Sequence, residues 1–174
     1  MRQLVIKLSE IFDEGITRHF IVPGAALGIT HHEVKLTQAI DVDCQLFKVN
    51  RDVVVHGTMG ITLRLLCSRC AEEFTSAFRI PLDAVYIPAQ ETSPDREKAL
   101  EEDETEALTY GGHTIDLAEM VRGKVFLSVP LQPLCTLRCK GLCPHCGVNW
   151  NVTTCQCVQG ELGSPFQLLK ELRF

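Results

Sequence analysis

The fold is decided by the stretch VVVHGTMGITLRLLC, residues 53–67. Its odd positions are mostly apolar, whereas its even positions include histidine, threonine and arginine. An alternation of period two over this length predicts a long β-strand with one buried face. The strand is expected to end at Cys67, the first residue of the pair Cys67-Ser68-Arg69-Cys70.

The flanking segments carry the same alternation. It is present before the long strand in residues 40–46 and after it in residues 74–82, and Asn50-Arg51-Asp52 predicts the first intervening turn. Shorter strands are expected at Thr17–Val22, His32–Leu36 and Leu108–Tyr110. Closely spaced strands without helical patterns between them favour an antiparallel sheet or a barrel.

Two helices are expected in the second half of the chain. Asp116 and Glu119 have the spacing of a capping box, and apolar residues at helical spacing follow to Val125. A short terminal helix is expected to open at Ser164-Pro165. The predicted fold class is therefore α+β: a mainly antiparallel sheet or barrel-like domain with one or two helices and a cysteine-rich C-terminal segment.

Composition divides the chain into four parts. They are a mainly β domain (1–90), an acidic flexible loop (91–107), a strand plus a helix packing on the sheet (108–130), and a cysteine-rich zinc segment with the terminal helix (131–174). The net charge is -5, but the acidic loop alone holds eight acids and two bases. Outside it, 15 bases face 14 acids, so the acidity does not exclude an anionic partner.

Several classes of function are disfavoured. The first residues contain no apolar h-region, and no run of 18 apolar residues follows, so we expect a cytoplasmic protein with no membrane contact. The chain has no GxSxG, P-loop, GxGxxG or HExxH motif. It is therefore not expected to be an enzyme or to have a small-molecule substrate.

Nine cysteines are the unusual feature of the composition, and in the cytosol they stay reduced. Eight lie in two groups with metal-ligand spacing, Cys67-x2-Cys70 and Cys135-x3-Cys139-x3-Cys143-x2-Cys146-x8-Cys155-x-Cys157. Zn²⁺ takes four such ligands in a tetrahedron, so we expect one or two zinc ions. Cys44 alternates with Val42 and Leu46 and is expected in the core.

Two partitions of these eight thiols are open. In the first, the four cysteines from Cys143 onward form a local site, and the other four form a second site between the strand end and the tail. In the second, the two C-x-x-C pairs face each other as in a zinc ribbon. Shorter loops lose less entropy on closure, which favours the first partition.

Four segments in order resemble the YceD family of bacterial and plastid proteins. They are Leu63–Phe74, Ile115–Pro130, Pro133–Asn149 and the closing segment from Pro165, and the run Cys139-Lys140-Gly141-Leu142-Cys143-Pro144-His145-Cys146-Gly147 is the most specific. The resemblance implies a non-enzymatic factor for assembly of the large (50S) ribosomal subunit. Such a factor promotes accumulation of 23S rRNA, and we expect it to bind this RNA or its precursor.

Five cations are candidates for RNA contact, namely Arg69, Arg138 and Lys140 in the cysteine segments and Arg122 and Lys124 on the helix. Their other role would be to neutralise zinc thiolates, which carry about -2 per four-cysteine site. Trp150 stands where the family usually has leucine, and it either packs on the metal loop or stacks on a base. The alternative function is a zinc-stapled module whose acidic loop docks a ribosomal protein or another assembly factor.

Overall fold

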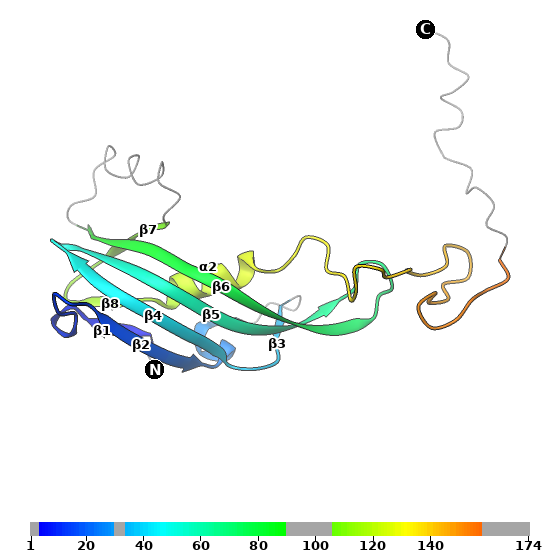
Figure 1. Ribbon diagram of the computed structural model, residues 1–174, viewed down its shortest axis with the longest axis horizontal. Coiled ribbons are helices and arrows are strands. Elements are labelled where there is room, and N and C mark those ends of the chain that lie inside the picture. The colour runs from blue at the N-terminus through cyan, green and yellow to red at the C-terminus, as the bar shows by residue number, and fades with distance from the viewer. Residues whose placement is uncertain (1–3, 30–33, 90–105, 158–174) are drawn as a thin grey trace, which may run out of the picture.

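A computed structural model describes residues 4–29, 34–89 and 106–157 of the chain (Figure 1). In chain order the elements are β1 (Val5–Lys7), the 3-10 helix η1 (Leu8–Glu10), β2 (Ile16–Val22), the 3-10 helix η2 (Gly24–Leu27), β3 (Lys35–Leu36), β4 (Ile40–Val49), β5 (Asp52–Leu66), β6 (Glu73–Pro88), β7 (Glu106–Tyr110), β8 (Thr114–Asp116) and α2 (Ala118–Leu127). The terminal helix expected after Ser164, and nearly all of the acidic loop, lie outside the described residues.

The centre of the fold is the antiparallel meander β4-β5-β6. β4 and β5 are joined by a two-residue turn in which Asn50 has a φ of 58°, a left-handed conformation that asparagine tolerates. β5 and β6 stay in register from Val53↔Tyr86 to Leu66↔Glu73. The alternation expected for residues 53–67 is confirmed, because apolar side chains at its odd positions are buried.

The main sheet has the strand order β2-β4-β5-β6-β7, and β3 pairs with β5 beyond the end of β4. It is mixed, because β7 pairs in parallel with β6. The order does not return from β7 to β2, so the described strands form an open sheet. The barrel-like form considered from the sequence is not the form adopted, and the antiparallel sheet is confirmed.

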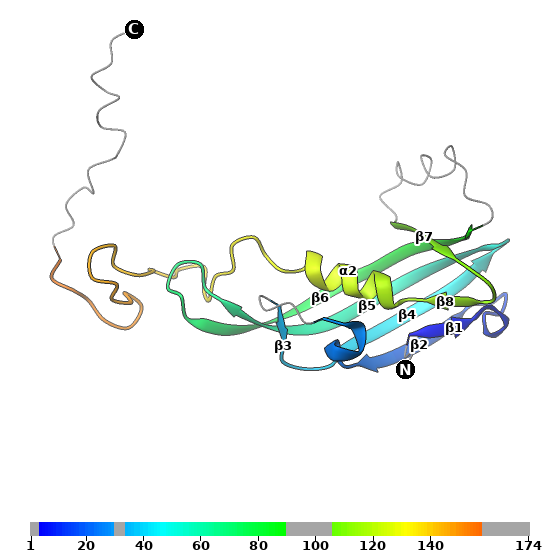
Figure 2. The same ribbon diagram turned by 180° about the vertical axis from the view of Figure 1, so that it is seen from behind.

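The two faces of the sheet differ. One, the inner face, is covered by α2 and by the small β1–β8 sheet, and these elements bury one apolar core with it (Figure 2). The other, the outer face, carries the alternate residues of β2, β4, β5 and β6 and is covered by no described element (Figures 1 and 2). The core thus uses one face of the sheet, and the described elements leave the other exposed.

Helix α2 forms where it was expected, with a different start. The Asp116 carboxylate accepts a hydrogen bond from the Ala118 N–H at 3.0 Å, as a capping aspartate does. Glu119 completes no capping box in the described structure, and the residue before the helix is Leu117. Met120, Val121 and Val125 are buried against the sheet. Among the described residues, no helix has the length and apolar character needed to span a bilayer.

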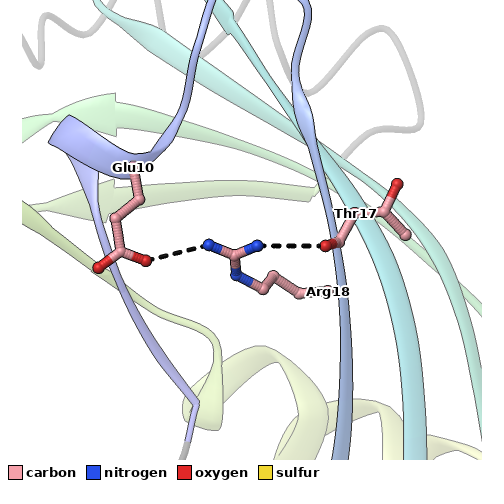
Figure 3. Close-up of polar contacts among 3 residues, drawn as sticks. All are labelled: Glu10, Thr17 and Arg18. Carbon is pink, nitrogen blue, oxygen red and sulfur yellow. Dashed lines mark hydrogen bonds and ion pairs between the residues drawn. The ribbon is translucent and has the colours of Figure 1, made fainter.

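Two strand pairings and one ion pair were not predicted from the sequence patterns. β1 and β8 have three residues each, too few for an alternation to register, yet they pair antiparallel across the chain. β7 joins β6 in parallel across the acidic segment. η1 is linked to β2 by an ion pair, since Arg18 Nη2 lies 3.1 Å from Glu10 Oε2 (Figure 3). Both side chains are partly exposed, so this pair contributes little stability.

Candidate metal centres and cationic surface

The first cysteine cluster joins the β5–β6 turn to the C-terminal tail. It consists of Cys67, Cys70, Cys135 and Cys139, whose sulfurs all lie within 4.8 Å of one another. Cys67 follows the last residue of β5, so the longest hairpin of the sheet carries half of this cluster to its tip. Figure 1 shows the tail, residues 128–157, running past that tip to the far end of the molecule.

The geometry of the first cluster fits a tetrahedral metal. Sulfurs about 2.3 Å from a zinc ion at the centre of a tetrahedron would lie about 3.8 Å apart. The Sγ atoms of Cys67 and Cys139 are 3.8 Å apart, and those of Cys70 and Cys135 are 3.7 Å apart. A disulfide would need about 2.0 Å, and all four cysteines are free.

Hydrogen bonds hold the tail against the hairpin tip around this cluster. Ser68 donates to the Pro133 carbonyl through its backbone N–H, at 2.8 Å, and through its hydroxyl, at 3.1 Å. The Arg69 guanidinium donates to the Cys139 carbonyl at 3.0 Å. Within the turn, the Ala71 N–H donates to the Cys67 carbonyl, and Ala71 adopts a φ of 56°. The first cluster is therefore built on a folded scaffold on both sides.

The second cysteine cluster is local to the tail. It consists of Cys143, Cys146, Cys155 and Cys157, whose sulfurs also lie within 4.8 Å of one another. The Cys143–Gly147 turn is closed by a hydrogen bond from the Gly147 N–H to the Cys143 carbonyl at 2.9 Å. Gly147 has a φ of 73° and open space where a Cβ would stand, so it is needed for its backbone conformation and not to relieve crowding.

The two clusters are tied to each other by backbone hydrogen bonds. The Leu142 N–H donates to the Arg69 carbonyl at 3.1 Å, and the Trp150 N–H donates to the Gly141 carbonyl at 3.0 Å. Gly141 has a φ of 78°, and a Cβ there would lie 3.1 Å from the Arg69 carbonyl oxygen. The eight thiols thus meet in the local partition, and the described structure does not bring the two C-x-x-C pairs to one centre.

Two side chains that the motif analysis did not assign to the thiols donate to sulfur. Asn151 Nδ2 lies 3.3 Å from Cys139 Sγ, and the indole Nε1 of Trp150 lies 3.4 Å from Cys155 Sγ. Asn151 is oriented by a second bond from Nδ2 to Asn149 Oδ1 at 2.8 Å. The sequence feature that could have pointed to these two donors is the run Asn149-Trp150-Asn151, which follows the Cys143–Gly147 knuckle.

These donors and the backbone favour thiolates in each cluster. Burial raises the pKa of the Cys67 thiol, but the backbone N–H groups of Cys135, Cys70 and Arg69 outweigh it and lower this pKa to about 6. The Trp150 indole N–H, assisted by the backbone of Cys157, lowers the pKa of Cys155 to about 6. At least one thiol in each cluster is thus prepared to bind a cation.

Other thiols in the same clusters resist ionisation. The backbone N–H of Glu72 lowers the pKa of Cys70, but burial and the neighbouring thiols outweigh it and raise this pKa to about 12. The Cys146 thiol and burial raise the pKa of Cys157 to about 12. Sulfurs this close cannot all carry charge unaided. A shared dication is what allows four of them to ionise together.

The remaining metal-type side chains lie apart from these clusters. Cys44 is buried in the main core, as expected, and burial raises its pKa to about 11. His145 is exposed in the knuckle and is not part of the second cluster. His19, Asp41 and Asp43 meet on the outer face, where the Asp43 carboxylate accepts a hydrogen bond from the His19 ring at 2.7 Å and raises the pKa of His19. All three are exposed.

The five cations expected to contact RNA lie in two places. Arg138 and Lys140 are exposed on the tail, and Arg69 lies at the hairpin tip with its guanidinium bound to the Cys139 carbonyl. Arg122 and Lys124 lie on α2, which packs against the inner face. The structure therefore does not gather the five into one patch.

The fold and these centres define a class: a β-sheet protein with an appended loop whose two four-thiol clusters could hold metal ions. The chain belongs to the YceD family, whose sequence model, described as "Large ribosomal RNA subunit accumulation protein YceD", matches residues 55–173. The match runs from β5 through both clusters. The family name supports a role in ribosome assembly.

Individual relatives are distant. An uncharacterised protein of Mycobacterium tuberculosis is 27% identical over 71% of this chain, and one of Mycobacterium leprae is 27% identical over 72%. The chain spans 58% and 55% of the length of these relatives. A chloroplastic YCED homolog 1 of Arabidopsis thaliana, named as a large ribosomal RNA subunit accumulation protein, is 34% identical over 34% of this chain and 18% of its own length. No solved structure matches the chain significantly.

Proposed function

We propose that this protein is a non-enzymatic factor for assembly of the large (50S) ribosomal subunit. It promotes accumulation of 23S rRNA by binding this RNA or its precursor in the cytoplasm. The observation that carries the proposal is the family match over residues 55–173, which includes the long hairpin and both cysteine clusters. An enzymatic role has no comparable support, because the family is named for RNA accumulation and not for a reaction.

Zinc is the metal that the donor sets favour. Each cluster offers four thiols and no carboxylate or imidazole, and zinc sites of this closed composition are structural. The first would hold its ion with Cys67, Cys70, Cys135 and Cys139, and the second with the remaining four. The role of the metal would be to fold the tail and to fix it on the hairpin tip.

Cations on the tail would then meet RNA. Arg138 and Lys140 are exposed and have no ion-pair partner among the described residues, so they can approach phosphates. Arg69 is better suited to a structural role, because its guanidinium already binds the Cys139 carbonyl. Arg122 and Lys124 would contact RNA only if it also reached the α2 side of the sheet.

Metal analysis combined with crosslinking to RNA in living cells tests the proposal. We expect two zinc ions per chain and crosslinks enriched in large-subunit rRNA over small-subunit rRNA. An unrelated zinc protein expressed at the same level is the control for abundance. Crosslinks to ribosomal proteins with none to rRNA would overturn RNA binding and favour the docking module. A visible iron–sulfur colour under anaerobic conditions would overturn zinc.

A further inference from the structure

The outer face of the sheet carries acidic and basic side chains in different rows. Asp43 and Asp83 lie on the β4–β5-turn side of Gly60 and are paired with His19 and His56, whereas Asp41 lies directly opposite Gly60, in the same row as Arg79. Toward the Cys67–Cys70 turn, the part here called the distal outer face presents two arginines among mostly small or polar residues, with Leu66 as an exposed apolar member. Its members are Gly60, Thr62, Arg64, Leu66, Glu73, Thr75, Ala77 and Arg79.

The two arginines of the distal outer face are exposed and uncommitted. Arg64 and Arg79 form no hydrogen bond or ion pair with any described residue. Nearby cations differ, because Lys35 pairs with Glu73 at 3.8 Å and Arg69 is held by the Cys139 carbonyl. Free guanidinium groups on a face that no described element covers can bind an anionic partner.

The strand register adds a second observation. Arg64 lies directly opposite Lys35 on β3, and like charges at opposed positions of a sheet are unfavourable. Arg79 lies directly opposite Gly60, which has no side chain to cover it, and Asp41 lies on the other side of Gly60 without an ion pair to Arg79. Arg64 faces Thr75, four residues before Arg79, so the arginines stand about 13 Å apart along the strands. An external anion at Arg64 would relieve its repulsion with Lys35. A longer anion that spans this distance would reach Arg79 as well.

The composition of the face indicates which part of an RNA it would contact. Bases that are read from a sheet stack on exposed aromatic rings. The distal outer face has no aromatic residue, and Phe74 and Phe78 of the same strand pack against the inner core. Arginine and threonine side chains can instead donate to phosphates and 2′-hydroxyls, which carry no base sequence.

We infer that the distal outer face docks the phosphate backbone of folded RNA, with Arg64 and Arg79 as its ion-pairing residues. The acids Asp41, Asp43 and Asp83 begin at the row of Arg79 and continue toward the β4–β5 turn, so we expect the phosphate contact on the hairpin-tip side of that row, next to the cysteine clusters. This inference rests on the proposed function, and it adds a contact surface on the sheet to the cations of the tail.

Binding of zinc-loaded protein to a 23S rRNA transcript, measured between about 50 and 200 mM salt, tests the inference. We expect Arg64→Gln/Arg79→Gln to weaken binding about tenfold and to lower the salt slope by about 1.4 to 1.8, as expected for two lost phosphate contacts. A blunt RNA duplex should show the same dependence, because only the backbone is contacted. Lys48→Gln, an exposed change at the end of β4 next to the β4–β5 turn, is the control and should leave binding unchanged.

The outcomes separate the inference from the proposed function. No binding of 23S rRNA by the unmodified protein would overturn both. If the parent protein binds clearly and the double variant binds with the same affinity, the inference alone is overturned. Arg64→Lys/Arg79→Lys should restore most of the affinity, and its failure to do so at normal zinc content would assign the arginines a structural role and overturn the inference. If the double variant loses binding to a ribosomal protein and keeps its binding to RNA, the inference is overturned as well.

Discussion

At the scale of single residues, the informative side chains are those that donate to sulfur. A hydrogen bond to a thiolate favours its charged form and orients it for a metal. Asn151 serves Cys139 in the first cluster although it lies in the loop of the second. Trp150 donates to Cys155 through its indole N–H. The described structure thus ties this tryptophan to the metal loop.

Asn151→Asp should loosen metal in the first cluster. It replaces an N–H donor near Cys139 Sγ with a carboxylate, which repels the thiolate. We expect zinc to dissociate about 10- to 100-fold more readily from one of the two sites, measured by competition with a colorimetric chelator. Val152→Ala, at a neighbouring side chain that is 82% exposed, is the control. Equal release from both variants would show that the Asn151 bond does not tune the site.

At the scale of elements, the β4–β5 contact depends on one glycine. A Cβ on Gly57 would overlap the Asp43 carbonyl oxygen and lie 2.7 Å from the Cα of Cys44. Gly60, three residues later on the same strand, has only the Asp41 Cβ nearby, at 3.7 Å. In the sequence both are interruptions of one strand and differ only in the face they occupy. The close approach of β4 at Gly57 is decided by the strand pairing.

Gly57→Ala should therefore destabilise the sheet, by about 2 to 3 kcal/mol, because β4 or β5 must shift to make room. Gly60→Ala should be neutral or stabilising by up to about 1 kcal/mol, since its Cβ fits and the unfolded chain loses freedom. Urea unfolding midpoints of the zinc-loaded proteins measure both changes. Equal midpoints for the two variants would mean that the strands can shift at Gly57 without a loss in the free energy of unfolding.

At the scale of the whole molecule, the sheet and the tail are stabilised in different ways. The sheet has its own large apolar core with α2, β1 and β8. The tail meets the hairpin tip through a separate small cluster in which Cys67, Cys70 and Cys139 are the buried members. A cluster made chiefly of thiols supplies little hydrophobic energy, so its order should depend on metal.

Removal of zinc by a strong chelator under reducing conditions should release the tail and leave the sheet folded. Hydrogen exchange would show lost protection at Leu142 and Trp150, whose N–H groups bond across the clusters, and retained protection in β4 and β5. Cys70→Ser in the presence of zinc should reproduce the local loss, whereas Cys44→Ala should not. Global unfolding on chelation would contradict this independence.

Much of the fold could be predicted because its signals are local. The alternation in residues 40–82 identifies three strands without knowledge of their partners, and the helical spacing after Asp116 identifies α2. The three-residue strands β1 and β8 could not be found this way, nor could the parallel pairing of β7. Such elements are stabilised by their partners and not by their own pattern.

The sequence by itself determined the long strands, the helix, the cysteine spacing and the family. The tertiary structure decided which thiols meet, that Arg69 is held by Cys139, and which face of the sheet the described elements leave exposed. The physical reason is distance along the chain. The contact between Arg69 and Cys139 joins residues 70 positions apart, and such a contact arises only when hairpin and tail fold against each other.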